Sequence, residues 1–278
     1  MDKTIGVIGL GLIGGSLAKA IKANTTHTVY GMDKRQEVME IALRQNAMDA
    51  ALTPALYDKC DMLLLALYPT DIISFVKDNI GSFKKGVVIV DCAGVKGNIC
   101  EALSEWVAGH GMYFIGGHPM QGIEKTGFES SYSHLFDGAT MILCKDRFTN
   151  LIALKAAEVL FTSLGFMKVT ITEAGEHDKI IAFTSQLAHV VSNAYIKSDI
   201  APKHMGFTAG SYKDLTRVAW LNEELWTELF FENKENLTAE IEGLADRLRD
   251  YANALREGDK EGMKRMLREG KLAKEAIG

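Results

Sequence analysis

Residues 4–24 read TIGVIGLGLIGGSLAKAIKAN, an apolar run that ends in glycines and continues into a stretch with helical spacing. The pattern GxGxxG lies between the predicted strand and the predicted helix. In a dinucleotide-binding turn, the first glycine permits the tight turn, the second lets the backbone approach the pyrophosphate, and the third lets the helix pack closely. The helix start also offers free N–H groups and partial positive charge to a phosphate. This context favours a dinucleotide site over a turn that only connects strand to helix. Contacts are expected from Gly9, Leu10, Gly11, Leu12, Ile13 and Gly14.

Asp33 closes the second predicted strand, 19 residues after Gly14. An acid at this place hydrogen-bonds the ribose hydroxyls of NAD and repels the 2′-phosphate of NADP. Lys34 and Arg35 follow directly and would weaken that preference. The sequence therefore predicts NAD as the cofactor, with NADP as the less favoured alternative.

Strands and helices alternate through the first part of the chain. Strands are predicted at 4–10, 27–33, 60–69, 86–94, 112–118, 139–144 and 168–172, with helices at 14–24, 35–47 and 70–83. Such alternation implies parallel pairing in a doubly wound sheet. After residue 172 only helical spacing remains, over 176–200 and 222–259. We expect an N-terminal α/β Rossmann-type domain, residues 1–171, and an all-α C-terminal dimerisation domain, residues 172–278. Because no Pro- or Ser-rich linker separates them, the domains should share an interface.

Composition excludes several classes of protein. The chain has 278 residues, of which 47% are hydrophobic and 24% charged, as in a soluble globular protein. A net charge of −5 gives no support for nucleic-acid binding, and no apolar run reaches the roughly 18 residues that span a membrane. The N-terminus lacks the features of a secretory signal. Four cysteines without a CxxC pair indicate no metal site. Buried, reduced thiols in a cytoplasmic protein are expected.

A second informative stretch, residues 114–128, reads FIGGHPMQGIEKTGF. His118 comes after two glycines at the end of a predicted strand and before Pro119. Ligands of doubly wound sheets bind beyond the carboxyl ends of strands. An enzyme that moves a hydride also needs a group that handles a proton, and histidine titrates near neutral pH. The pattern is compatible with a catalytic histidine, although composition alone also fits a histidine on a surface loop.

This stretch, together with SYKDLTRVA at 211–219 and FFENKEN at 230–236, resembles the prephenate/arogenate dehydrogenase family of tyrosine biosynthesis. The likeness extends to GLGLIGGSLA at 9–18 and to the pair His177–Asp178, and it covers nearly the whole chain. It implies the monofunctional form, without a mutase segment or an appended regulatory module. Such enzymes oxidise C4 of prephenate with NAD(P), release the ring carboxylate as carbon dioxide and yield 4-hydroxyphenylpyruvate.

The resemblance also implies roles for individual residues. His118 would be the catalytic histidine that hydrogen-bonds the substrate 4-hydroxyl, and Arg217 would hold a substrate carboxylate. Without the resemblance, Arg217 would be interpreted as a helix-surface ion pair with Asp214. Further substrate contacts are expected from His189, Glu124, Gly210 and Trp226. His189 and Trp226 could equally be core residues that pack between helices. Further cofactor contacts are expected from Tyr68, Pro69 and Gly94.

Two departures from the family pattern concern the substrate. Gly94 stands where the family often has a serine, and SQLAH at 185–189 replaces the common SHLPH, which brings in Gln186 and Ala188. We interpret both changes as bearing on specificity. Prephenate is favoured as substrate, and the alternatives are arogenate, a related dehydrogenase of hydroxyacids or cyclic imines, and an NAD-binding sensor without turnover. The long apolar helices predict a homodimer.

Overall fold

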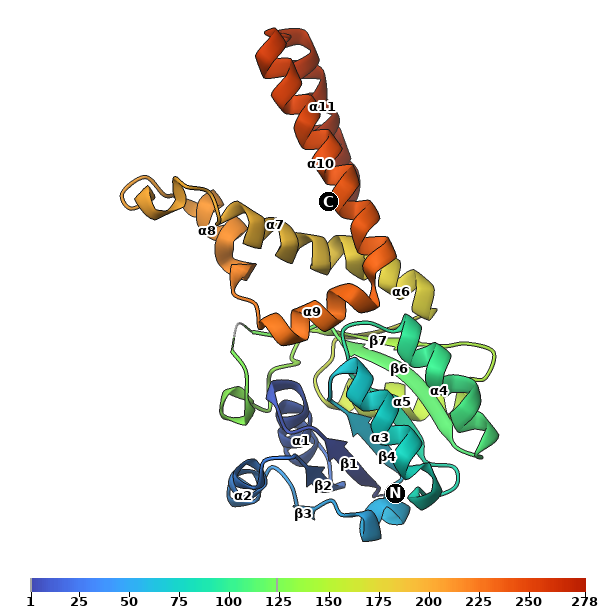
Figure 1. The fold of residues 1–278 in the computed structure, drawn as a ribbon. Coiled ribbons are helices and arrows are strands. Elements are labelled where there is room, and N and C mark those ends of the chain that lie inside the picture. The colour runs from blue at the N-terminus through green and yellow to red at the C-terminus, as the bar shows by residue number, and fades with distance from the viewer. Residues whose placement is uncertain (1, 124) are drawn as a thin grey trace.

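The computed structural model describes residues 2–123 and 125–278. Across these residues the N-terminal part forms one eight-stranded sheet in the order β3-β2-β1-β4-β5-β6-β7-β8 (Figure 1). The strands are β1 (Thr4–Ile8), β2 (Thr28–Met32), β3 (Ala50–Ala51), β4 (Met62–Leu65), β5 (Val88–Asp91), β6 (Tyr113–Pro119), β7 (Thr140–Cys144) and β8 (Lys168–Thr172). The order reverses between β1 and β4, which is where ligands bind in sheets of this kind.

Pairing is parallel from β3 through β6, as predicted. The prediction of parallel pairing is wrong for β7, which runs antiparallel to β6, while β8 is parallel to β7. A parallel neighbour needs a crossover, usually through a helix. Between β6 and β7 the described residues contain only the short 3₁₀ turn Phe128–Ser130. Without a crossover helix, the chain enters β7 from the end of the sheet at which β6 finishes, so the two strands run antiparallel.

Helices cover both faces of the sheet because successive strand residues point to opposite sides. In β4, Met62 and Leu64 pack into one core with α1 (Leu12–Asn24), α2 (Gln36–Arg44) and α5 (Leu151–Ser163). Leu63 and Leu65 pack into the other core with α3 (Pro69–Asn79) and α4 (Gly97–Gly109). This arrangement confirms the predicted doubly wound α/β fold.

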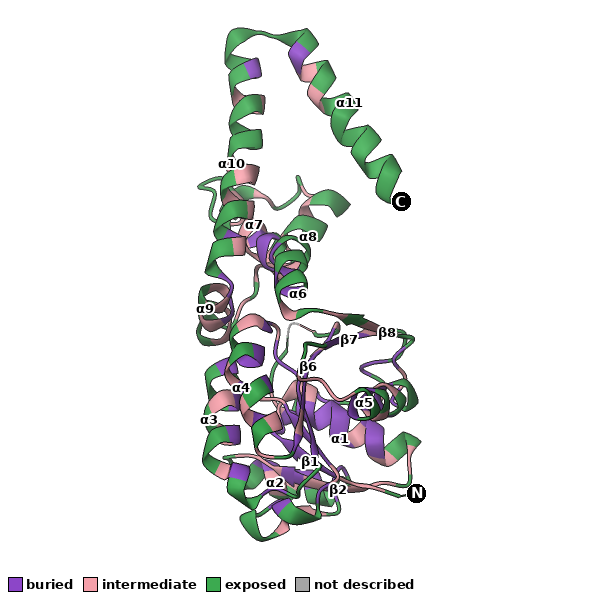
Figure 2. Ribbon diagram, turned by 90° about the vertical axis from the view of Figure 1, so that its right-hand side faces the viewer, coloured by how far each residue is buried: buried purple, intermediate pink, exposed green. Residues whose placement is uncertain are grey.

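The rest of the described chain is helical, as predicted. Its helices are α6 (Ala174–Ile181), α7 (Leu187–Tyr195), α8 (Gly210–Thr216), α9 (Glu223–Glu232), α10 (Lys234–Glu257) and α11 (Lys260–Ile277). The helix predicted over 176–200 is divided by a π-helical segment, Ala182–Gln186, and the one predicted over 222–259 breaks at Asn233. Helices α10 and α11 form a largely exposed arm (Figure 2). Within the described residues, no helix has the length and apolar character needed to cross a membrane.

Short turns complete the chain. They are the 3₁₀ segments Pro54–Lys59, Ile80–Ser82, Phe128–Ser130, Ala201–Lys203 and Arg217–Ala219.

Carboxylates of the helical part join the two domains. Glu228 of α9 accepts hydrogen bonds of 2.8 Å from both the backbone N–H and the hydroxyl of Thr70, at the start of α3. Asp178 of α6 accepts from the backbone N–H of Lys96 and of Gly97, at the start of α4. A helix start has unsatisfied N–H groups and partial positive charge, so each acid is favourable there. The predicted interface between the domains is thereby confirmed, on the carboxyl edge of the sheet (Figure 1).

Two buried amides tie the helical elements to each other. Asn233 Nδ2 donates to the Asp178 carbonyl at 2.8 Å and to Gln186 Oε1 at 2.7 Å, and Gln186 Nε2 donates to the Leu229 carbonyl at 2.9 Å. Gln186 is 1% exposed. Both ends of its amide are therefore used inside the helical domain.

Candidate active site

The glycine-rich turn fits the predicted nucleotide site. Gly9 has a φ of +87°, and a β-carbon on Gly14 would lie 1.9 Å from the Gly9 carbonyl oxygen, so neither position accepts a side chain. A β-carbon on Gly11 would meet nothing within 4 Å. The turn is therefore closed toward β1 and open where a pyrophosphate would bind. The Leu10 side chain is buried, so only its backbone can serve a cofactor.

Asp33 lies directly after β2 and beside this turn. Its Oδ2 accepts from the Leu10 backbone N–H at 2.9 Å, and its Oδ1 accepts from the Arg35 backbone N–H at 3.0 Å. The Arg35 side chain also pairs with Asp33, at 3.4 Å. An adenosine ribose at the end of β2 would meet this carboxylate, which fits the predicted role.

The other predicted cofactor residues lie on the same edge of the sheet. Tyr68 precedes α3 and is 38% exposed, and Pro69 is the first residue of that helix. Gly94 lies in the loop between β5 and α4. Together with the glycine turn, these residues form a site that fits a dinucleotide.

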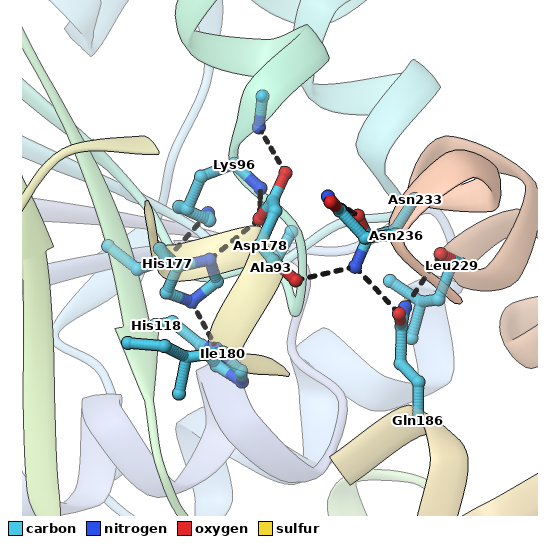
Figure 3. Close-up of polar contacts among 12 residues, drawn as sticks. Ala93, Lys96, His118, His177, Asp178, Ile180, Gln186, Leu229, Asn233 and Asn236 are labelled. Carbon is cyan, nitrogen blue, oxygen red and sulfur yellow. Dashed lines mark hydrogen bonds and ion pairs between the residues drawn. The ribbon is translucent and has the colours of Figure 1, made fainter. Parts of the chain in front are cut away.

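His118 is the second-last residue of β6, which ends one residue later than the predicted strand. The β5–β6 pairing ends at Ile115, and His118 is paired across the sheet only with Ile142 of β7. The strand thus extends past its parallel neighbour and carries the ring toward the helical domain. His118 Nδ1 lies 2.9 Å from His177 Nε2 (Figure 3).

A buried ion pair fixes the backbone next to His118. Lys96 and Asp91 have fully buried side chains and contact each other, and Lys96 Nζ also donates to the Gly117 carbonyl at 2.7 Å. Asp91 in turn accepts from the backbone N–H of Ala93 at 2.9 Å and of Gly117 at 3.3 Å. Desolvation of two charges is costly unless such bonds satisfy them. The sequence analysis did not predict this pair. The available signal was Asp91 at the end of an apolar strand, with Lys96 five residues later.

The surroundings favour a neutral His118. Burial lowers the pKa of this imidazole well below its ordinary value, and the nearby His177 and the Lys96 cation lower it further. At neutral pH the ring is therefore uncharged and can accept a proton.

Predicted substrate residues gather in the helical domain. His189 of α7 has Nδ1 2.9 Å from the Val218 carbonyl, which can only accept, so this nitrogen carries the proton. The Trp226 ring lies against the His189 ring, with centroids 3.9 Å apart. His189 and Arg217 both line a cavity of about 530 Å³, together with Ala188 and Asp214. Gly210 begins α8, and Glu124 lies outside the described residues.

Helix α9 connects these residues to the sheet. It carries Trp226, and its Leu229 would lie 3.4 Å from a β-carbon placed on Gly94. The same β-carbon would lie 3.9 Å from His118 Nε2. His118 Nε2 thus faces the Gly94 loop and α9, at the junction of the domains. A separate hollow of about 720 Å³, near Lys3 and His27, lies at the amino end of β1, away from this junction.

Two further predictions concern cysteines and metals. All four cysteines are free and buried, as predicted, and burial raises the pKa of Cys60 and of Cys144 to about 12. Among the described residues, no group of three or more His, Cys, Asp or Glu side chains is placed to hold a metal ion.

Comparison with known proteins decides the family. Residues 17–169 match the family model of the prephenate dehydrogenase nucleotide-binding domain, and residues 173–269 match that of the prephenate dehydrogenase dimerization domain. This chain belongs to the prephenate dehydrogenase family. It is accordingly an oxidoreductase, and the resemblance found in the sequence is confirmed.

Similarity to individual proteins supports the same family. A prephenate dehydrogenase of Lactococcus lactis subsp. cremoris is 30% identical over 99% of this chain and 77% of its own. A cyclohexadienyl dehydrogenase of Zymomonas mobilis is 27% identical over 99% of this chain and 96% of its own. The structure of prephenate dehydrogenase from A. aeolicus, in complex with hydroxyphenyl propionate and NAD+, is 26% identical and has a TM-score of 0.86, covering 100% of this chain and 99% of that one.

The glycine turn yields a prediction that separates fold from cofactor binding. Gly14→Ala forces a β-carbon against the Gly9 carbonyl and should destabilise the protein by about 1–3 kcal/mol, the usual cost of overpacking. Gly11→Ala meets no protein atom and should keep the wild-type stability, yet it should weaken NAD binding because the methyl group occupies cofactor space. Denaturant unfolding and NAD titration by fluorescence measure the two effects. Equal stability of the two variants would contradict this account of the turn.

Proposed function

We propose that this chain oxidises prephenate with NAD, releasing carbon dioxide and 4-hydroxyphenylpyruvate, in tyrosine biosynthesis. The observation that carries the proposal is the His118 imidazole at the domain junction. Its pKa is lowered by burial, its Nδ1 contacts His177, and its Nε2 faces the Gly94 loop on the edge that carries the glycine turn. A neutral imidazole nitrogen in this position is suited to accept the proton of a substrate hydroxyl.

Gly9, Gly11, Gly14 and Asp33 would hold NAD, which when bound accepts a hydride from C4 of the substrate. Tyr68, Pro69 and Gly94 would complete the cofactor site. His118 Nε2 accepts the proton of the 4-hydroxyl as the hydride leaves. When the bond from C1 to the carboxylate breaks, its electron pair enters the ring and gives the aromatic product. The protonated imidazole then returns the proton to the phenolic oxygen.

Arg217 would clamp a substrate carboxylate through two parallel hydrogen bonds. His189, Trp226, Gly210 and Glu124 would shape the rest of the substrate site, a role that the shared cavity of Arg217 and His189 supports. Arogenate is the alternative substrate, and it carries an ammonium group where prephenate has a keto group. The presence of Asp214 in the lining of that cavity favours this alternative, since an acid attracts an ammonium.

We further propose that the chain divides into domains at residues 1–171 and 172–278 and forms a homodimer through the helical domain. The dimerization-domain match supports the dimer. So do exposed apolar side chains on the arm, among them Leu248, Leu255 and Leu267, which are 58–73% exposed in the single chain. The four free, buried cysteines fit a reducing compartment, and we include the cytoplasm in the proposal.

Turnover tests the reaction directly. The purified protein should form NADH from NAD and prephenate, and more slowly from arogenate. His118→Asn should lower kcat by about 10²–10⁴-fold, the contribution of a general base. Arg217→Ala should raise KM for prephenate and leave NAD affinity unchanged, while the exposed Arg44→Ala serves as the charge-matched control. Binding of NAD without turnover of either substrate would refute the proposal, and faster turnover of arogenate would reverse the choice of substrate.

The lowered pKa of His118 predicts the acid side of the pH profile. The neutral ring is the active form, so activity should persist at pH values below about 6.5, the ordinary pKa of histidine. It should decline only as the pH approaches the lowered pKa of His118. The pH dependence of kcat/KM reports this group in the free enzyme. A loss of activity centred at or above the ordinary value would contradict the effect of burial.

A further inference from the structure

His118 has two ring nitrogens, and the structure engages the one that does not face the Gly94 loop. Its Nδ1 lies 2.9 Å from Nε2 of His177, and the two rings meet edge to face with centroids 5.1 Å apart. In a hydrogen bond between two imidazole nitrogens, one nitrogen donates and the other accepts. The direction of this bond decides whether a neutral His118 carries its proton on Nδ1 or on Nε2.

Asp178 determines that direction. Its Oδ1 lies 2.7 Å from His177 Nδ1 and also accepts from the Lys96 backbone N–H at 2.8 Å, while its Oδ2 accepts from the Gly97 backbone N–H at 2.7 Å (Figure 3). Backbone N–H groups can only donate, so this carboxyl group is an acceptor on both oxygens. The proton between His177 and Asp178 therefore belongs to His177 Nδ1.

We infer that His177 is a positioning residue that sets the tautomer of His118. A neutral His177 that donates from Nδ1 has a lone pair on Nε2, so it accepts from His118 Nδ1–H. His118 Nε2 is then left without a proton, on the side that faces the Gly94 loop. This inference rests on the proposed function only for its consequence, which is that His118 is ready to accept the proton of a substrate hydroxyl.

The surroundings of the two rings support this arrangement. His177 has a fully buried side chain, so water does not compete for its nitrogens. Among the described residues, the cation that acts on His118 is Lys96, which is itself paired with Asp91. The Lys96 cation and burial both disfavour a protonated His118, so this ring enters the bond as a neutral group.

His177 is not needed for the structural task of its neighbour. Asp178 caps α4 through its own carboxylate oxygens, and its carbonyl is held by Asn233 Nδ2. A change at His177 that leaves Asp178 in place should therefore spare the domain interface and affect His118. This separation allows a positioning role to be distinguished from a general loss of structure.

Two amide variants test the inference. In His177→Asn the amide reaches the position of Nδ1, so the bond to Asp178 is kept and the acceptor for His118 is lost. In His177→Gln the amide reaches the position of Nε2 and its oxygen can accept from His118 Nδ1–H. The measurement is the ¹⁵N NMR spectrum of histidine-labelled protein near neutral pH, with the His118 signals assigned by their loss in His118→Asn. Steady-state kinetics with prephenate and NAD follow on the same samples.

Wild-type protein should show His118 protonated on Nδ1 and bare on Nε2. His177→Asn should populate the other tautomer and lower kcat by about tenfold or more, up to the full 10²–10⁴-fold contribution of a general base, with little change in KM. His177→Gln should restore both the Nδ1–H signal and most of kcat.

Three results would overturn the inference. They are wild-type His118 protonated on Nε2, a His177→Asn variant with unchanged tautomer and unchanged kcat, and a His177→Gln variant as impaired as His177→Asn. If His177→Asn fails to fold, the wild-type spectrum still decides the tautomer. If wild-type protein shows the expected tautomer without turning over prephenate or arogenate, the proposed function fails and the assignment of the proton stands.

Discussion

The Asp178 carboxylate is the contact on which the rest of the site depends. It belongs to the helical domain, yet it receives the two backbone N–H groups that open α4 in the nucleotide-binding domain. Hydrogen bonds to a charged group contribute about 1.5–3 kcal/mol each, and the partial positive charge of a helix start adds to them. The same carboxylate holds His177, which holds His118. One side chain therefore joins the docking of the domains to the orientation of the His118 ring.

Around this contact, two kinds of polar interaction lie at the carboxyl edge of the sheet, namely a buried ion pair and carboxylates that cap helix starts. Below it, the buried Asp91–Lys96 pair fixes the backbone at Gly117, beside the catalytic candidate. Above it, Glu228 caps α3 in the way that Asp178 caps α4. Of these contacts, Asp178 and Glu228 join the two domains, and the buried Asp178 bond to the Lys96 N–H is expensive to leave unpaired, so together they favour one relative position of the domains. A hydride transfer needs such precision, since both reactants must be aligned.

Much of the fold could be predicted from the sequence, because glycine spacing, apolar runs and helical periodicity are local signals. The strands expected at 4–10, 27–33 and 168–172 lie where the structure has β1, β2 and β8. The antiparallel β7 could not be predicted, since its direction depends on the path of the long connection before it. The same holds for the π-helical segment, which interrupts a stretch with ordinary helical spacing.

Within the site, the sequence indicated His118 but not what holds it. His177 is 59 residues away along the chain, and only the docking of α6 beside α4 on the nucleotide-binding domain brings the two rings together. Gln186 is a second case. The sequence marked it only as a departure from the family motif, whereas the structure shows its amide bonded to Leu229 and Asn233. Motif spacing identifies which residues matter, but burial and partners decide what each of them does.

The most direct test of the central claim is a crystal structure of this protein with NAD and a hydroxyphenyl carboxylate that imitates the product. The account predicts the phenolic oxygen within about 2.6–3.2 Å of His118 Nε2, the hydrogen-bond range of a general base, and the carboxylate on Arg217. A phenolic oxygen bound elsewhere, or a His118 ring turned so that Nδ1 faces the ligand, would contradict it.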